Sequence, residues 1–81
     1  MMLYRTMLGD VIRTERLDRG LTMRQVCAEA NMSIGYLSEV ERGIKEASSE
    51  VLGSIAAAMG LAVWELVGKV SDQMKHYAKA A

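Results

Sequence analysis

The stretch from residue 21 to residue 43 constrains the fold of this chain more than any other part. It reads LTMRQVCAEANMSIGYLSEVERG. Thr22 is suited to cap a helix, because Gln25 follows at the spacing of a capping box. Asn31 favours the left-handed conformation that ends a helix. Ser33 can cap a second helix, and a final glycine stops it. The stretch therefore predicts two short helices joined by a tight turn.

Both predicted helices have one apolar side. It carries Val26, Cys27 and Ala30 in the first helix and Leu37 and Val40 in the second. The other side of the second helix is small and polar, with Ser33, Gly35, Tyr36, Ser38, Glu39 and Arg42. A helix that packs on its neighbour with one side and presents hydrogen-bonding groups on the other is suited to the major groove of DNA. We therefore predict a helix-turn-helix over residues 22–42.

The composition of the chain favours helices throughout. Its 81 residues suffice for a single domain, residues 1–81, and they include no proline and no phenylalanine. Alanine, leucine, methionine and valine dominate the apolar residues, which favours helices and leaves little material for a sheet. Apolar periodicity predicts three further helices, over residues 6–19, 48–59 and 63–77. We expect an all-α fold of five helices whose ends, residues 1–5 and 76–81, fray.

The single cysteine and the single histidine exclude several kinds of site. Cys27 lies on an apolar side, so we expect a packed core residue, with a redox thiol as the alternative. His76 is distant from it in the sequence, and these two side chains do not complete a zinc site. No glycine-rich phosphate loop occurs. We predict a binding module without enzymatic activity, metal or cofactor.

Charge and apolar content bear on where the chain works and what it binds. No apolar run of about 18 residues and no secretory leader occur, and a lone cysteine fits a reducing interior, so we expect a cytoplasmic protein. Ten basic and ten acidic residues cancel. This balance argues mildly against nucleic acid, although phosphate attraction depends on where the charges lie. A protein-interaction module without a DNA role therefore stays open as an alternative.

Arg16 lies on the otherwise apolar side of the helix predicted over residues 6–19. A buried arginine is unfavourable unless a carboxylate meets it. Glu41, near the end of the second short helix, is the candidate partner. The alternative is that both side chains are solvated surface charges.

Residues 8–43 resemble the Cro/C1-type, or Xre-like, helix-turn-helix regulators. That family has an arginine midway in its first helix, Gly-Leu-Thr before the second, and Glu-Arg-Gly at the end of the recognition helix. The matching residues here are Arg16, Gly20, Leu21, Thr22, Glu41, Arg42 and Gly43. The resemblance covers about residues 8–67. It implies a five-helix, lambda-repressor-like DNA-binding domain with a buried ion pair between Arg16 and Glu41.

One branch of this family is more similar still. Residues 33–50, SIGYLSEVERGIKEASSE, are similar to the clp gene regulators, which activate genes of the Clp protease. The resemblance implies an activator of ATP-dependent (Clp) protease and stress genes. One departure from the family pattern is Ala62, which stands where the last helix often begins with serine or proline. The capping of that helix is therefore an open point.

The resemblance also implies which residues meet DNA. Residues 22–25 would contact the sugar-phosphate backbone and residues 33–42 would enter the major groove. The candidate DNA-binding residues are Thr22, Met23, Arg24, Gln25, Ser33, Ile34, Gly35, Tyr36, Ser38, Glu39, Arg42, Lys45 and Ser48. The Tyr36 hydroxyl is expected to reach a phosphate, with a core position as its alternative. Ser48 or Ser49 caps the helix that follows, whose N–H groups can hold a phosphate, and capping alone explains the two serines equally well.

The candidates differ in what they can recognise. Ser38 and Glu39 are the expected base readers, and a glutamate can accept from cytosine N4, although a solvated glutamate is a serious alternative. Ile34 can touch a thymine methyl group or be a half-buried turn residue. Arg24 and Lys45 are expected on phosphates.

The last predicted helix bears on the oligomeric state. Its apolar stripe exceeds what a small core requires, and such a surplus usually marks a partner surface. The residues expected in a dimer interface are Val63, Trp64, Val67, Val70, Met74 and Tyr77. We predict a two-fold homodimer on a palindromic operator, with RNA polymerase as a further partner if the protein activates. The alternatives are a last helix folded onto its own core, and an antitoxin that pairs this fold with a toxin.

Overall fold

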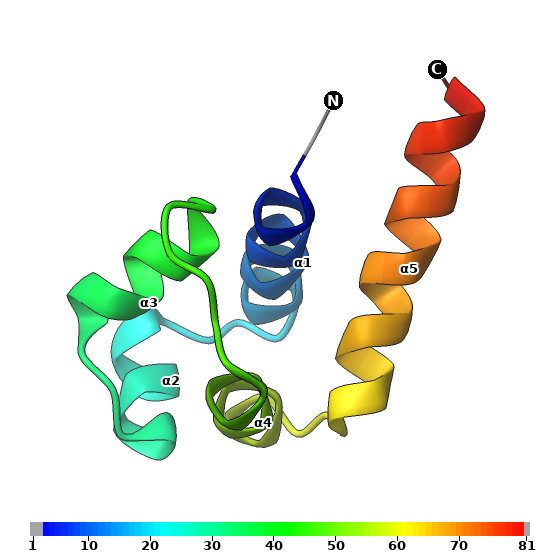
Figure 1. The fold of residues 1–81 in the computed structure, drawn as a ribbon. Helices are drawn as coiled ribbons and strands as arrows, with labels where there is room; N and C mark the ends of the chain where they lie inside the picture. Colours follow the sequence, from blue (N-terminus) through cyan, green and yellow to red (C-terminus); the bar gives the residue numbers. More distant parts are fainter. Residues whose placement is uncertain (1–2, 81) are drawn as a thin grey trace.

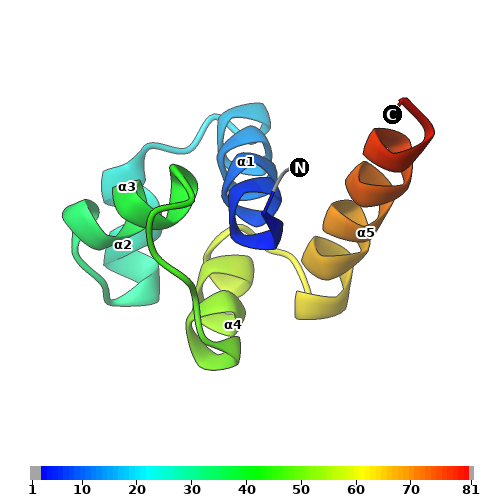
Figure 2. The ribbon, with the colours of Figure 1, turned by 45° about the horizontal axis from the view of Figure 1, so that its top comes forward.

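The computed structural model describes residues 3–80 and contains five α-helices in that range. They are α1 (Tyr4–Asp18), α2 (Met23–Ala30), α3 (Ile34–Glu41), α4 (Ser49–Ala58) and α5 (Val63–Ala80). In Figure 1, α1 stands in the middle, with α2 and α3 on one side of it and α5 on the other. The same order is seen after a turn of the molecule in Figure 2. The expected all-α fold of five helices is confirmed.

The ends of the helices follow from local hydrogen bonds. The Thr22 hydroxyl accepts from the Gln25 N–H at 3.1 Å, and the Gln25 side-chain oxygen accepts from the Thr22 N–H at 2.8 Å, which completes the capping box. Ser33 and Ser48 each accept in the same way from the N–H three residues on. The left-handed residues are Gly20, Asn31, Gly43 and Gly60. All were expected to end helices, and the structure confirms these positions.

Both outer helices extend further than the sequence predicted. Helix α1 begins at Tyr4 rather than near Thr6, because the Leu3 carbonyl accepts from two N–H groups of the first turn, at 3.1 and 3.2 Å. Helix α5 continues to Ala80, since no helix breaker occurs at its end and alanine favours helix. The expected fraying is therefore wrong for residues 4–5 and 76–80. Met1, Met2 and Ala81 lie outside the described residues.

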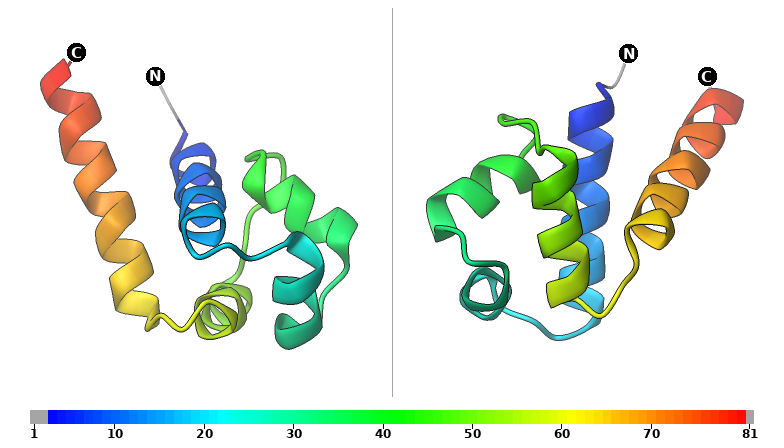
Figure 3. Two further views of the ribbon diagram at one scale, coloured as in Figure 1. Left: turned by 180° about the vertical axis from the view of Figure 1, so that it is seen from behind. Right: turned by 60° about the horizontal axis from the view of Figure 1, so that its bottom comes forward.

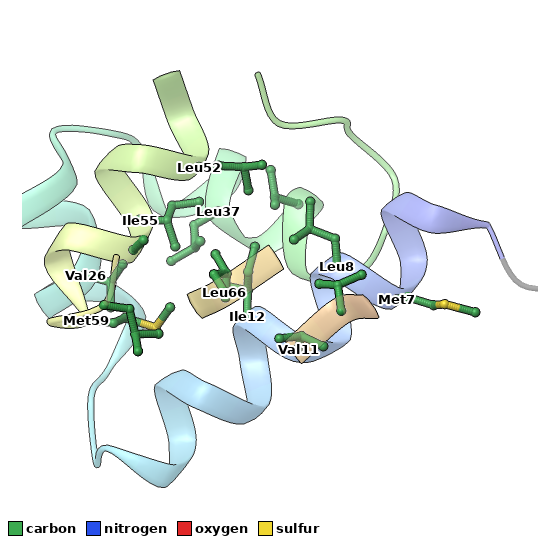
Figure 4. Close-up of a cluster of buried hydrophobic side chains, with 14 of the residues drawn as sticks. Met7, Leu8, Val11, Ile12, Val26, Leu37, Leu52, Ile55, Met59 and Leu66 are labelled. Carbon is green, nitrogen blue, oxygen red and sulfur yellow. The ribbon is translucent and has the colours of Figure 1, made fainter. Parts of the chain in front are cut away.

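One hydrophobic core is shared by all five helices. Ile12, Leu37, Ile55 and Leu66 are fully buried and come from α1, α3, α4 and α5. Figure 4 shows these side chains in one cluster. Burying each such side chain stabilises the fold by roughly 1.5–3 kcal/mol. Cys27 of α2 is also buried, which confirms the expected core position.

Helix α5 packs along α1 rather than standing free (Figure 3). Val70 has no exposed surface, so it belongs to the core of its own chain. Its assignment to a dimer interface is therefore wrong. The reason is that the middle of α5, where Val70 lies, packs against α1. Polar contacts also join the two helices: Lys69 Nζ lies 3.6 Å from Glu15 Oε1, and Gln73 donates to Asp10 at 3.4 Å.

The turn between α4 and α5 answers the open question about capping. The Ala62 N–H donates to the Glu65 carboxylate at 2.9 Å, so a side chain within the helix supplies what a serine would have supplied. The turn bends the chain by 101°. No single helix in residues 3–80 is long and apolar enough to cross a membrane, and α4 and α5 reach that length and apolarity only as a bent pair.

Candidate nucleic-acid interface

A buried ion pair holds α3 from its inner side. Arg16 Nε donates to Glu41 Oε2 at 2.7 Å, and Arg16 Nη2 donates to Glu41 Oε1 at 3.0 Å. The two side chains are 8% and 1% exposed. The remaining terminal nitrogen, Nη1, donates to the Leu21 carbonyl at 3.0 Å. The pair that the resemblance implied is present, and it joins α1, α3 and the turn before α2.

The electrostatics of this pair are consistent with its geometry. The hydrogen bond to Glu41 raises the pKa of Arg16, and burial, which acts in the opposite direction, is the smaller effect. Arg16 therefore stays charged although it is buried. Charge-assisted, two-point contacts of this kind fix geometry as well as energy. The end of α3 is consequently held in one orientation against α1.

The other side of α3 is open to solvent. Its buried residues are Leu37, Val40 and Glu41. Its outward residues, exposed or half-buried, are Ser33, Ile34, Gly35, Tyr36, Ser38, Glu39 and Arg42. In Figures 1 and 2, α3 lies on the far side of α1 from α5. Helix α3 therefore has the two-sided character that the sequence predicted for a recognition helix.

The first turn of α2 lies beside α3, because Met23 lines the same hollow as Ser38 and Arg42. Thr22, Arg24 and Gln25 are exposed and Met23 is half-buried. The capping box uses the side-chain oxygen of Gln25. The amide nitrogen of that side chain is the atom that remains for a phosphate oxygen. The cap therefore orients a potential DNA contact as well as ending the helix.

Tyr36 has a partner that the sequence did not indicate. Its hydroxyl donates to the Glu46 carbonyl at 3.2 Å. The expectation of a phosphate contact is corrected to that extent, because the hydroxyl proton is used within the chain. This bond ties α3 to the loop that carries Lys45 and leads to Ser48. Both of those candidates are exposed.

A shallow hollow between α1, α2 and α3 is lined in part by the basic side chain of Arg13, which was not among the residues predicted from the sequence. It is lined by Asp10, Arg13, Met23, Ser38, Glu41 and Arg42. Arg13 is exposed and lies one turn before Arg16, on the neighbouring side of α1. The helical period of three to four residues is the signal that places Arg13 near the candidate groups of α2 and α3.

The expected dimer residues are separate from this interface. Val63, Trp64, Val67, Met74 and Tyr77 are all exposed on α5, and Trp64 is 76% exposed. Helix α1 lies between α5 and α3 (Figure 2). Contact with another molecule through α5 would thus leave the outward side of α3 free.

Residues 12–63, which include α2 and α3, match the family model described as Helix-turn-helix. The chain belongs to the helix-turn-helix family of the Xre/Cro type. It is therefore a DNA-binding transcription regulator of this family.

Two relatives of this helix-turn-helix protein match nearly its whole length. The transcriptional regulator ClgR of Mycobacterium tuberculosis H37Rv is 40% identical over 79 residues, which are 98% of this chain and 70% of that protein. The crystal structure of the clp gene regulator ClgR from Corynebacterium glutamicum has a TM-score of 0.90 and 39% identity. The alignment covers 98% of this chain and 84% of that one. The similarity to the clp gene regulator branch is thereby confirmed.

A third comparison concerns the fold alone. The restriction-modification controller protein C.AhdI from Aeromonas hydrophila has a TM-score of 0.74 and 24% identity. That alignment covers 76% of this chain and 94% of the controller protein. The same arrangement of helices therefore occurs in proteins of different sequence.

Proposed function

We propose that this protein binds a roughly palindromic operator as a homodimer and activates genes of the Clp protease and the stress response in the cytoplasm. The observation that carries the proposal is the two-sided α3, which is held by a buried ion pair on one side and is open and polar on the other. The regulated genes are proposed from the 39–40% identity to two regulators named ClgR.

In this proposal α3 enters the major groove. Ser38 and Glu39 lie on its outward side and read base edges, and the exposed Ile34 contacts a thymine methyl group. Arg24 and Lys45 bind phosphates on either side of the groove. Phosphate contacts set the register of the protein on the duplex, and base contacts select the sequence.

A zero net charge is compatible with this mode of binding. The ten basic and ten acidic residues cancel over the whole chain, but phosphates respond to the charges near them. Arg13, Arg24, Arg42 and Lys45 are exposed around α2 and α3. The proposal thus relies on a local group of cations rather than on a basic protein.

Homodimerisation is proposed through the exposed stripe of α5. Trp64, Val67 and Met74 are large apolar side chains in water, and a contiguous apolar surface is commonly covered by a partner. A two-fold dimer pairs like surfaces. It presents two recognition helices to half-sites about one DNA turn, roughly 34 Å, apart. Contact with RNA polymerase, which activation requires, would use surfaces outside α3 and α5.

The salt dependence of binding to a clp promoter fragment tests the DNA part of the proposal. We expect affinity to fall steeply as salt rises, with a log–log slope of about −0.9 for each phosphate neutralised. Footprinting on the same fragment should show two half-sites related by a dyad. Absence of binding at low salt would favour a protein-interaction module, and a small protein that co-purifies would favour an antitoxin.

Genome-wide mapping of the bound sites tests the proposed regulon. We expect sites upstream of Clp protease genes, and reduced transcripts of those genes when the protein is deleted. Increased transcripts would indicate a repressor. Sites confined to other promoters would leave the DNA-binding role intact and remove the Clp assignment.

A further inference from the structure

Helix α1 approaches the end of α3 at Gly9 more closely than any residue with a side chain allows. A Cβ atom placed on Gly9 would lie 2.6 Å from the Glu41 carbonyl oxygen and 2.9 Å from its carbonyl carbon, and closer still to the Val40 carbonyl oxygen. These neighbours are backbone atoms of α3, so no change of rotamer relieves the contact. The distance between the two helices therefore depends on the absence of a side chain at position 9.

A second contact lies one turn earlier on α1. Arg5 Nε donates to the Gly43 carbonyl at 2.9 Å. Gly43 follows Arg42, the C-cap residue of α3, and has a φ of 74°. A Cβ there would meet the backbone of Thr6 at 2.8 Å. Arg5 and Gly9 thus lie on the side of α1 that meets the C-terminal end of α3, and the Arg16 pair continues the same line of contacts.

We propose that Gly9 and Arg5 are positioning residues for DNA recognition, because together they set the distance and the tilt of α3 relative to the rest of the domain. Hydrogen bonds to base edges depend on distances defined within a few tenths of an ångström. Attraction to phosphates tolerates larger shifts, since it is largely non-specific. A displaced α3 loses preference for its operator before it loses affinity for DNA. This inference rests on the proposed role of α3 as the recognition helix.

Gly9→Ala tests the inference. The Kd is measured for an operator fragment and for an unrelated duplex of the same length, at one salt concentration. The specificity ratio is the Kd for the unrelated duplex divided by the Kd for the operator. We expect this ratio to fall by about tenfold, which is comparable to the effect of one mismatched base pair. A role in stability alone lowers the folded fraction, which weakens binding to both duplexes equally. An unchanged ratio in the folded variant overturns the inference.

Gly53→Ala is the matched control. Gly53 also lies within a helix, but a Cβ there meets only the Val63 side chain at 3.7 Å, an ordinary contact distance. The ratio of the two Kd values should equal that of the parent. The control thus separates the effect of a methyl group in a helix from the effect of the contact between α1 and α3.

Arg5→Ala keeps the test decisive if Gly9→Ala does not fold. The substitution removes the hydrogen bond to Gly43 and one cation, and the lost charge affects both duplexes. We expect the ratio to fall in the same direction by a smaller factor, and an unchanged ratio overturns the inference. If the parent itself does not prefer the operator, the proposed function fails. If the parent does and the variants keep its ratio, only the positioning role fails.

Discussion

Arg16 and Glu41 are 25 positions apart in the sequence, yet their side chains meet through two hydrogen bonds beneath the outward side of α3. One partner comes from α1, at the centre of the fold, and the other from the end of α3, the helix that we propose enters the major groove. In the proposed function, stability and recognition therefore depend on the same contact. Removing either side chain should affect the fold first.

Glu41→Ala should destabilise the protein by about 3–5 kcal/mol, because it leaves Arg16 buried without a carboxylate. Urea unfolding followed by circular dichroism measures the change. Glu39→Ala on the same helix is the control, since Glu39 lies on the outward side, and it should alter the unfolding free energy little. A Glu41→Ala midpoint equal to that of the parent would show that the ion pair does not stabilise the fold.

Arg42→Ala should weaken operator binding without changing the melting temperature, because Arg42 is exposed at the end of α3. If the side chain reads a base, affinity falls by about 1–3 kcal/mol and sequence preference relaxes. If it binds a phosphate, the slope of log affinity against log salt concentration becomes less steep by about one instead. Binding titrations at several salt concentrations distinguish these cases. Lys79→Ala, at the far end of α5, should change neither quantity, and wild-type affinity in Arg42→Ala would contradict the prediction.

Met74→Glu should convert the dimer to a monomer and leave the fold intact, because Met74 is exposed on the apolar stripe of α5. Sedimentation velocity at high micromolar concentration measures the state. His76→Glu places the same charge on another side of α5 and should leave the dimer unaffected. A monomeric parent at that concentration, or a dimeric Met74→Glu, would refute the proposed interface.

Cys27 should make stability fall at alkaline pH. Burial raises the pKa of its thiol, with a further contribution from Glu41, which Arg16 partly opposes. The folded state therefore holds the proton more tightly than the unfolded state. The contribution of the thiol to the free energy of unfolding is fully present below the pKa of the unfolded state, about 8.5. It is lost as the pH rises through the higher pKa of the folded state.

Denaturant unfolding of the parent and of Cys27→Ala between pH 7 and about pH 10 measures this contribution. The difference in unfolding free energy between the two proteins should shrink with rising pH, while groups titrating in both cancel. Parallel curves would mean that the thiol proton is not linked to folding.

The parts of the fold that sequence could predict are those with a local cause. Thr22 and Gln25 are three residues apart, and the capping box they form needs no information from the rest of the chain. The same holds for Ser33 as a cap, whereas the sequence left Ser48 and Ser49 as alternatives and the structure has Ser48. Arg16 and Glu41 were paired through their place in a family pattern, since spacing alone left surface charges as an alternative.

The errors have a non-local cause. Val67, Val70 and Met74 lie on neighbouring rows of one helix, and only the angle at which α5 packs on α1 decides which row is buried. The partner of Tyr36 depends on the path of the loop after α3. The contact of Gly9 with the backbone of α3 has no signature in the sequence around it.

The division of α3 into two sides also makes the domain a scaffold for engineering. Leu37, Val40 and Glu41 seat the helix, whereas Ile34 and Ser38 take no part in the buried ion pair. Outward positions can therefore be randomised as a set and screened against new target sequences. If α3 reads DNA as proposed, new specificities could be selected in this way, provided that position 9 remains glycine.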